Sequence, residues 1–400
     1  MGRDYVRGAQ GTVPPKWGPL PGDDPSGGAG RAPVAQLRAL RRRTSSVVQR
    51  SPAPRITDVA RHAGVSMKTV SRVLNDEPNV QPQMRERVLA AVTALNYRPN
   101  VFARSLASSR SYVLGLLYYV SSAEFVGGLQ QGATARCRAL GYHLVVESLE
   151  DNAHDVERQL SHLVHTLRPD GLILAPPVCD DPQVLAALAQ AEVRCVRISP
   201  GSAGAAVGRV SMDDTAAARE MTEFLVGLGH RRIGFIQGDP AQAAAPRRHQ
   251  GYLEALAAHH IALDPELVVP GDFTFRSGLQ ACERLLALAE PPSAIFAAND
   301  DMAMGAVMAA QRSGHQVPGD LSVAGFDDST MASLVWPQLT TVRQPVAEMA
   351  IAAVDMLVAR ATAKGQGETP PASEAVLPHA LVERGTTAPP RLRRGVRRSA

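Results

Sequence analysis

Residues 56–75 of this chain read ITDVARHAGVSMKTVSRVLN, a pattern of two short amphipathic helices separated by a glycine. Thr57 can cap the first helix, and Gly64 can supply the left-handed residue that ends it. One face of this helix carries the apolar residues Val59, Ala60 and Ala63. Two short helices joined through a glycine-containing turn are typical of a helix-turn-helix unit, so this stretch predicts a small α-helical domain.

The second helix of this unit is predicted to have one buried face and one exposed face. Ser66 can cap it. Its buried face would carry Val70, Val73 and Leu74, and its other faces Met67, Lys68, Ser71 and Arg72. A third helix over residues 82–95 would close the core with Val88, Ala91, Val92 and Leu95. An exposed helix on so small a domain predicts a binding surface.

Beyond Tyr112 the pattern changes to apolar strands that alternate with amphipathic helices. The expected strands cover residues 113–118, 143–147, 171–174, 195–198, 233–236, 267–269, 294–297 and 321–326. The expected helices cover residues 125–139, 153–167, 182–190, 214–228, 246–259, 276–289 and 301–313. Such a series predicts parallel sheets joined by right-handed crossovers. We expect two successive sheets, hence two lobes with a cleft, and ligand-binding residues after the carboxyl ends of the strands.

Charge is unevenly distributed along the 400 residues. The formal net charge is only +4, from 42 Lys plus Arg against 38 Asp plus Glu. Residues 55–111 carry nine basic and four acidic side chains, whereas residues 112–388 carry 19 basic and 31 acidic ones. The basic ends favour an anionic polymer as partner, although solvated tails without any partner would have the same charge.

Several classes of protein are disfavoured by what the sequence lacks. Four scattered cysteines form no CxxC pair, so we expect no disulfide framework, no metal site and no cofactor. There is no apolar run of 18 residues and no apolar signal segment, which predicts a cytoplasmic protein without a membrane span. There is no GxSxG, P-loop or GxGxxG motif, and the pair Asp213-Asp214 fits a helix N-terminus. We therefore expect no enzymatic activity.

Several motifs in a fixed order resemble the lactose-repressor (LacI/GalR) family of bacterial transcription regulators. Besides residues 56–75 they are Leu95–Asn100, Ala103–Leu106, Leu228–Ile233, Ala298–Asp300 and Val323–Asp328. The resemblance covers about residues 55–388. It implies an N-terminal all-α helix-turn-helix headpiece followed by an α/β two-lobed effector domain like the periplasmic binding proteins.

The resemblance also divides the chain. It implies a headpiece over residues 55–98, a hinge helix or linker over 99–111, and an effector-binding and dimerisation domain over 112–388. The segments outside it, residues 1–54 and 389–400, are Arg-rich and are expected to be disordered tails.

By this resemblance DNA is contacted from the headpiece and the hinge. The implied residues are Thr57, Ser66, Met67, Lys68, Thr69, Arg72, Asn75, Ala103 and Leu106. Met67, Lys68 and Arg72 would read bases, whereas hydroxyl side chains would contact phosphates. Thr57 and Ser66 can equally be helix caps only, and Arg72 a solvated charge. Leu106 would wedge between base pairs, or else belong to a flexible linker and pack on the core.

The resemblance implies an effector pocket lined by Ser122, Arg248, Phe273, Asn299 and Asp327. Such a set suits a polyhydroxylated ligand, because polar groups pair with hydroxyls and a ring covers the apolar sugar face. Small serines in the loop after the first strand favour a sugar over a nucleobase, although that loop is shorter than is usual in the family. Asp327 can alternatively be a carboxylate that caps a loop.

The function implied is that of a nucleoid-associated repressor of carbohydrate-utilisation genes. It would bind a palindromic double-stranded operator as a homodimer, with a tetramer left open, under the control of a small effector. Whether the effector releases or strengthens operator binding is open. The alternative is a sugar-binding receptor without a role at DNA, which the helix-turn-helix pattern disfavours.

Overall fold

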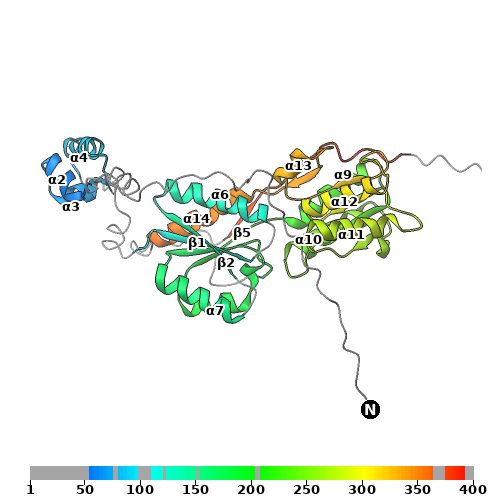
Figure 1. The fold of residues 1–400 in the computed structure, drawn as a ribbon, viewed down its shortest axis with the longest axis horizontal. Helices are drawn as coiled ribbons and strands as arrows, with labels where there is room; N and C mark the ends of the chain where they lie inside the picture. Colours follow the sequence, from blue (N-terminus) through cyan, green and yellow to red (C-terminus); the bar gives the residue numbers. More distant parts are fainter. Residues whose placement is uncertain are drawn as a thin grey trace, which may run out of the picture. The chain divides into compact units, whose positions relative to one another are not determined.

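The computed structural model describes residues 54–74, 80–97, 110–119, 123–149, 153–202, 208–363 and 374–391 (Figure 1). The chain divides into two compact units, residues 1–98 and 99–400. Most of the predicted hinge and of both predicted tails lies outside the described residues. We call residues 54–97 the headpiece.

The headpiece consists of three helices: α2 (Ile56–Ala63), α3 (Met67–Leu74) and α4 (Pro82–Ala94). They enclose one small core. Its buried members are Val59, Ala60, Ala63, Val70, Val73, Val88, Ala91 and Tyr97. The helix-turn-helix prediction is therefore confirmed, and its second helix contributes only its predicted apolar face to the core.

The ends of the first two helices show which side chains cap them. Helix α2 begins one residue before Thr57, and its first turn is closed by the Arg55 amide, which donates to Asp58 at 2.9 Å. The prediction that Thr57 caps this helix is therefore wrong. Ser66 does cap α3, because its Oγ accepts from the Thr69 amide at 3.1 Å.

Gly64 ends α2 with a left-handed φ of 61°, as predicted. The Arg87 guanidinium of α4 lies directly against this turn and donates to the Ala63 carbonyl at 2.6 Å. A Cβ atom at position 64 would come within 2.6 Å of Arg87 Nη2. Glycine is thus required both by the backbone conformation and by the close approach of Arg87.

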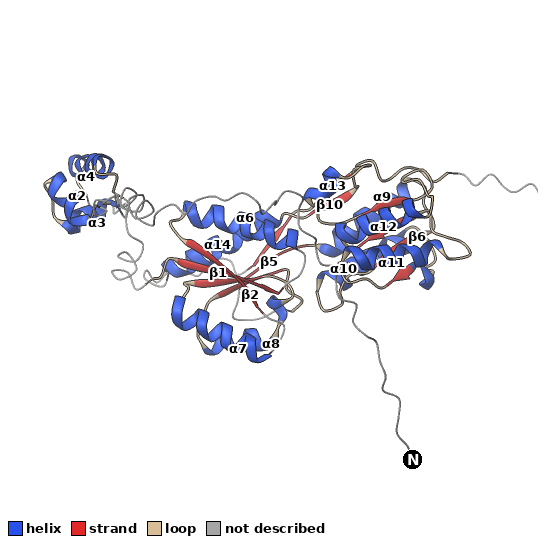
Figure 2. Cartoon of the chain, viewed as in Figure 1, coloured by secondary structure: helices blue, strands red, loops and turns tan. Residues whose placement is uncertain are grey.

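The second unit contains two lobes. The first lobe has a six-stranded parallel sheet in the order β11-β5-β4-β3-β1-β2. The strands are β1 (Val113–Tyr119), β2 (His143–Leu149), β3 (Gly171–Leu174), β4 (Cys195–Ile198), β5 (Gly208–Met212) and β11 (Glu374–Leu377). Helices α6 (Ala123–Ala139) and α14 (Val346–Ala363) cover one face, and α7 (Ala153–His162) and α8 (Pro182–Gln190) the other (Figure 2).

The second lobe has a four-stranded parallel sheet in the order β7-β6-β8-β9. Its strands are β6 (Ile233–Ile236), β7 (Val268–Val269), β8 (Ala294–Ala297) and β9 (Ser322–Ala324). Its helices are α9 (Asp214–Gly227), α10 (Ala244–Ala258), α11 (Phe275–Leu286), α12 (Asp300–Arg312) and the short α13 (Thr330–Leu334). Strands β10 (Thr341–Arg343) and β12 (Ala380–Val382) form an antiparallel pair that continues this sheet beyond β9.

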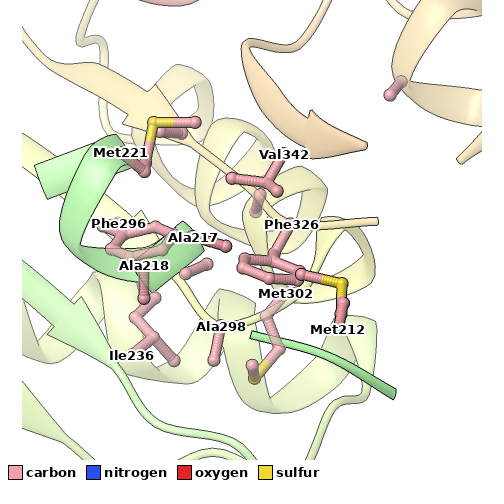
Figure 3. Close-up of a cluster of buried hydrophobic side chains, with 14 of the residues drawn as sticks. Met212, Ala217, Ala218, Met221, Ile236, Phe296, Ala298, Met302, Phe326 and Val342 are labelled. Atoms are coloured by element: carbon pink, nitrogen blue, oxygen red, sulfur yellow. The ribbon is translucent and has the colours of Figure 1, made fainter. Parts of the chain in front are cut away.

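A continuous apolar core connects the two lobes. Phe296 and Phe326 of the second lobe belong to the same buried cluster as Met212, the last residue of β5 in the first lobe (Figure 3). A second cluster fills the space between the first sheet and α7 and α8. The four cysteines are buried and free, as expected of small core residues.

The expectation of two sheets in two lobes is confirmed, but the two sheets do not strictly follow each other along the chain. After β10 the chain returns to the first lobe, where α14 packs against the sheet and β11 pairs with β5. It then enters the second lobe again as β12. Three crossings therefore join the lobes, after β5, after β10 and after β11. We did not predict these crossings from the sequence, because β11 is a half-exposed edge strand whose residues show little apolar pattern.

Smaller differences concern single elements. Strand β5 was not predicted, and the helix expected over residues 153–167 changes to a π-helix at Leu163–Leu167. The strand expected from Leu267 begins one residue later, because Leu267 ends a short 3-10 turn. Within the described residues, no helix is long and apolar enough to cross a membrane.

Candidate functional site

The candidate DNA-contacting surface is one side of α3 in the headpiece. Val70 and Val73 are buried, whereas Lys68 and Arg72 are exposed and Met67 is 53% exposed. The three side chains predicted to read bases therefore lie together on the solvent side of one helix. Two of them are cationic, which suits an approach to a phosphate-lined groove.

The hydroxyl side chains of the headpiece have different environments. Thr57 is exposed in the first turn of α2. The hydroxyls of Ser66 and Thr69 lie 2.9 Å apart and form a hydrogen bond with each other. Their predicted contacts with phosphates stay predictions. Four further predicted site residues, Asn75, Ala103, Leu106 and Ser122, lie outside the described residues.

The second unit contains a cavity of about 430 Å³ at the carboxyl ends of strands from both sheets. Its wall in the first lobe includes Phe125, Pro176 and Ser199. Its wall in the second lobe includes the predicted residues Arg248, Phe273, Asn299 and Asp327. The structure thus brings four of the five predicted effector-binding residues to one cavity, at the location expected for an open α/β sheet.

Arg248, on α10, is held by partners inside the second lobe. Its Nε donates to Asp214 at 2.9 Å and its Nη1 donates to the Ala298 carbonyl at 2.6 Å. Its guanidinium also lies 3.7 Å from the centre of the Phe326 ring. The side chain is only 5% exposed, yet Nη2 has no partner among the described residues. One N–H group of a rigid, buried arginine is therefore available to the cavity.

Asp327 follows β9 with a φ of 135°. Its Oδ1 accepts from the Gln344 amide at 2.6 Å and lies 3.8 Å from Arg248 Nη1. Burial raises the pKa of Asp327, and the buried carboxyl of Asp300 raises it further, whereas Arg248 lowers it. Its Oδ2 has no hydrogen-bond donor among the described residues. The Asp327 carboxyl and the Arg248 guanidinium therefore lie next to each other, and together they offer an acceptor and a donor to neighbouring hydroxyls.

Phe273 presents an aromatic ring to the cavity from a left-handed backbone, with a φ of 66°. Its carbonyl accepts from the Asn299 amide at 3.0 Å, while the Asn299 oxygen accepts from the Met302 amide at 3.0 Å and caps α12. The ring lies so close to Gly238 that a Cβ atom there would overlap it. The amide nitrogen of Asn299 thus helps to hold Phe273 in place, while its oxygen caps α12.

Sequence reasoning missed the residues that hold these side chains. Asp213 caps α9, as predicted for this pair, but Asp214 is 1% exposed and forms the ion pair with Arg248. Gln344 and Gly238 were also missed. A buried arginine needs a carboxylate partner, but the sequence did not indicate which carboxylate that is. No sequence pattern indicated Gln344 or Gly238.

Two family models match the chain. Residues 55–100 match the bacterial regulatory proteins of the lacI family, and residues 222–387 match a periplasmic binding protein-like domain. The chain is 34% identical to catabolite control protein A of Priestia megaterium over 335 residues, which cover 83% of this chain and 98% of that protein.

Solved structures agree with these matches. The lac repressor dimer bound to operator and the anti-inducer ONPF is similar with a TM-score of 0.67 and 30% identity, over 84% of this chain and 99% of that one. The complex of the transcriptional regulator CelR with cellobiose has a TM-score of 0.64 and 33% identity, over 83% and 99%. With its headpiece, its two-lobed domain and these relatives, the chain belongs to the lacI family of bacterial regulatory proteins.

Proposed function

We propose that the protein is a repressor that binds a palindromic operator as a homodimer and responds to a small polyhydroxylated effector. The observation that carries this proposal is a cavity in which Arg248 Nη1 and Asp327 Oδ1 lie 3.8 Å apart beside the aromatic ring of Phe273. The relatives are transcription regulators, and as a repressor this protein would act at the nucleoid.

The cavity suits a sugar in size and in chemistry. Its volume lies within the range of about 300–1,000 Å³ that is typical of small-molecule sites. Phe125 and Phe273 offer rings for the apolar face of a pyranose, while Asp327 and Arg248 pair with its hydroxyls. The relative CelR is known as a complex with cellobiose, which supports the same ligand class here.

Dimerisation is supported by an apolar surface around α13. Trp336 is 87% exposed, Leu334 is 69% exposed, and Met331 of the same segment is exposed as well. Contiguous apolar side chains of this size are rarely left in water on a monomer and mark an interface. A second copy of the chain is the partner that a palindromic operator requires.

The lobes are joined in a way that can transmit ligand binding. Glu124 of the first lobe accepts from the amide of Thr330, and Arg247 of the second lobe donates to the Pro200 carbonyl at 2.7 Å. Pro200 and Arg247 are each next to a residue that lines the cavity. A ligand held between the lobes would therefore favour one angle between them and so change the affinity for the operator.

The test combines operator selection with a ligand screen. An operator is selected from random DNA by the full-length protein, and fluorescence polarisation then measures its affinity at several salt concentrations. We expect salt-sensitive binding to a palindrome, and a sugar found by thermal shift should change that affinity. Failure to select any DNA, with or without sugars, would contradict the repressor proposal.

A further inference from the structure

We propose that the cavity selects effectors by charge: it accepts a neutral or amino-bearing polyol and rejects a polyol that carries a carboxylate or a phosphate. This inference rests on the proposed function and makes its ligand class narrower. It comes from the charges that line the cavity and from the partners that each of them already has.

The lining of the cavity is strongly acidic. Among the described lining residues, the carboxylates of Asp239, Asp272 and Asp301 and the carboxyl of Asp327, whose pKa burial raises, stand beside one guanidinium, that of Arg248. Like charges repel each other, and the repulsion is strongest where burial reduces screening by water. An anionic ligand would therefore meet several unfavourable interactions at once.

The guanidinium of Arg248 does not compensate for these carboxylates. Arg248 is ion-paired with Asp214, which is as deeply buried as the arginine itself. The pair as a whole is neutral, so Arg248 offers the ligand an N–H group without a net positive charge. A carboxylate or phosphate placed there would compete with Asp214 for the same guanidinium.

Three hydrogen-bond donors at the cavity, those of Gln344, Asn299 and Thr274, already have partners. The Gln344 amide donates to Asp327, and the Asn299 amide donates to the Phe273 carbonyl. The hydroxyl of Thr274 donates to Asp272 at 2.6 Å. An anion is acceptor-only and needs several donors, whereas a neutral hydroxyl can donate to the carboxylates that remain.

The pKa values of two lining carboxyls, Asp301 and Asp272, are shifted in opposite directions. Burial raises the pKa of Asp301, and the neighbouring carboxylate of Glu124 raises it further. Hydrogen bonds from Ser277 and Thr274 lower the pKa of Asp272, which keeps that carboxylate charged. A further anion in the cavity would add to this repulsion, while an ammonium group would relieve it.

The test compares ligands that differ only in charge. Calorimetry with the full-length protein measures the affinities for glucose, galactose and cellobiose and for their matched uronic acids, phosphates and amino sugars. We expect each anionic derivative to bind about 100-fold or more weakly than its neutral parent, and the amino derivative to bind at least as well. An anionic derivative that binds as tightly as its parent overturns the inference but leaves the effector proposal intact.

Variants show whether the discrimination comes from the cavity. Asp301→Asn removes one lining charge at nearly constant volume and should narrow the ratio of neutral to anionic affinity several-fold. Asp320→Asn, which removes a carboxylate that pairs with Arg391 outside the cavity lining, is the matched control and should leave the ratio unchanged. An unchanged ratio in Asp301→Asn contradicts the assignment. If no ligand of any charge binds, both this inference and the proposed sugar effector fail.

Discussion

The surface of α3 and the effector cavity present their functional side chains in opposite ways. On α3 the side chains of Met67, Lys68 and Arg72 are exposed, and the period of one helix is enough to bring them together. In the cavity, Arg248 and Asp327 come from distant elements and are held by their partners Asp214 and Gln344. Substitutions on the exposed surface of α3 can therefore change its binding specificity without loss of stability. Substitutions of the buried, paired residues of the cavity cannot.

The strongest test of this difference is Asp214→Ala, which removes the partner of Arg248. An unpaired buried guanidinium should destabilise the second unit by about 3–5 kcal/mol. Chemical denaturation measures this loss. Asp213→Ala, one residue away, removes only a helix cap and should cost about 1 kcal/mol. Equal effects of the two substitutions would show that the ion pair does not matter for stability.

Gly238→Ala tests whether the position of the Phe273 ring depends on space alone. The added methyl group overlaps the ring, so we expect a loss of up to about 3 kcal/mol of stability together with a clear loss of sugar affinity. Gly227→Ala is the control, because nothing lies within 4 Å of a Cβ atom there. Alanine at that position near the end of α9 should be neutral or slightly stabilising. Unchanged calorimetry for Gly238→Ala would remove Phe273 from the site.

Arg72→Ala tests the exposed surface. We expect it to cost about 2 kcal/mol of operator affinity through the loss of a base contact, while the free energy of unfolding changes by less than about 0.5 kcal/mol. Fluorescence polarisation and denaturation of the same preparation measure the two quantities. The control is Arg61→Ala on α2, whose exposed side chain pairs with Asp58. A large loss of stability in Arg72→Ala would mean that the side chains on the surface of α3, like those of the cavity, also contribute to the stability of the fold.

The smallest expected effect is a pH dependence that comes from Asp327. A carboxyl whose pKa is raised in the folded state binds more protons there than in the unfolded chain. Its contribution to stability is therefore largest at low pH and is lost as the pH rises above about 4, towards the raised value. The slope is at most about 1.4 kcal/mol per pH unit, the limit for one proton, and the opposing effect of Arg248 on the pKa narrows the pH range over which it applies.

The difference between the native protein and Asp327→Asn isolates this dependence from other groups. Burial lowers the pKa of His230 and His249, so these histidines give the opposite slope in both proteins. Denaturation at intervals between pH 5 and pH 8 should show the native protein losing stability relative to the variant. A constant difference across this range would mean that Asp327 has an ordinary pKa.

Much of the fold followed from sequence because its signals are local. The helices of the headpiece and most strands of the two sheets lie within a few residues of their predicted bounds. The strand ends also pointed to the cavity, because parallel strands place their carboxyl ends at one edge. We did not predict the exposed edge strand β11 or the return of α14 to the first lobe. No local sequence pattern indicates which of the two sheets these elements join.

The sequence by itself determined the three-helix headpiece, the two parallel sheets and the approximate position of the pocket, because amphipathic periods and strand ends are properties of neighbouring residues. Only the tertiary structure decided the electrostatics of that pocket. The partner of Arg248 lies 34 residues away, and Asp327 meets Arg248 and Gln344 from separate elements. Whether a carboxylate is a cap, a buried counter-ion or a ligand contact depends on which distant groups remove it from water, and that is settled only when the chain is folded.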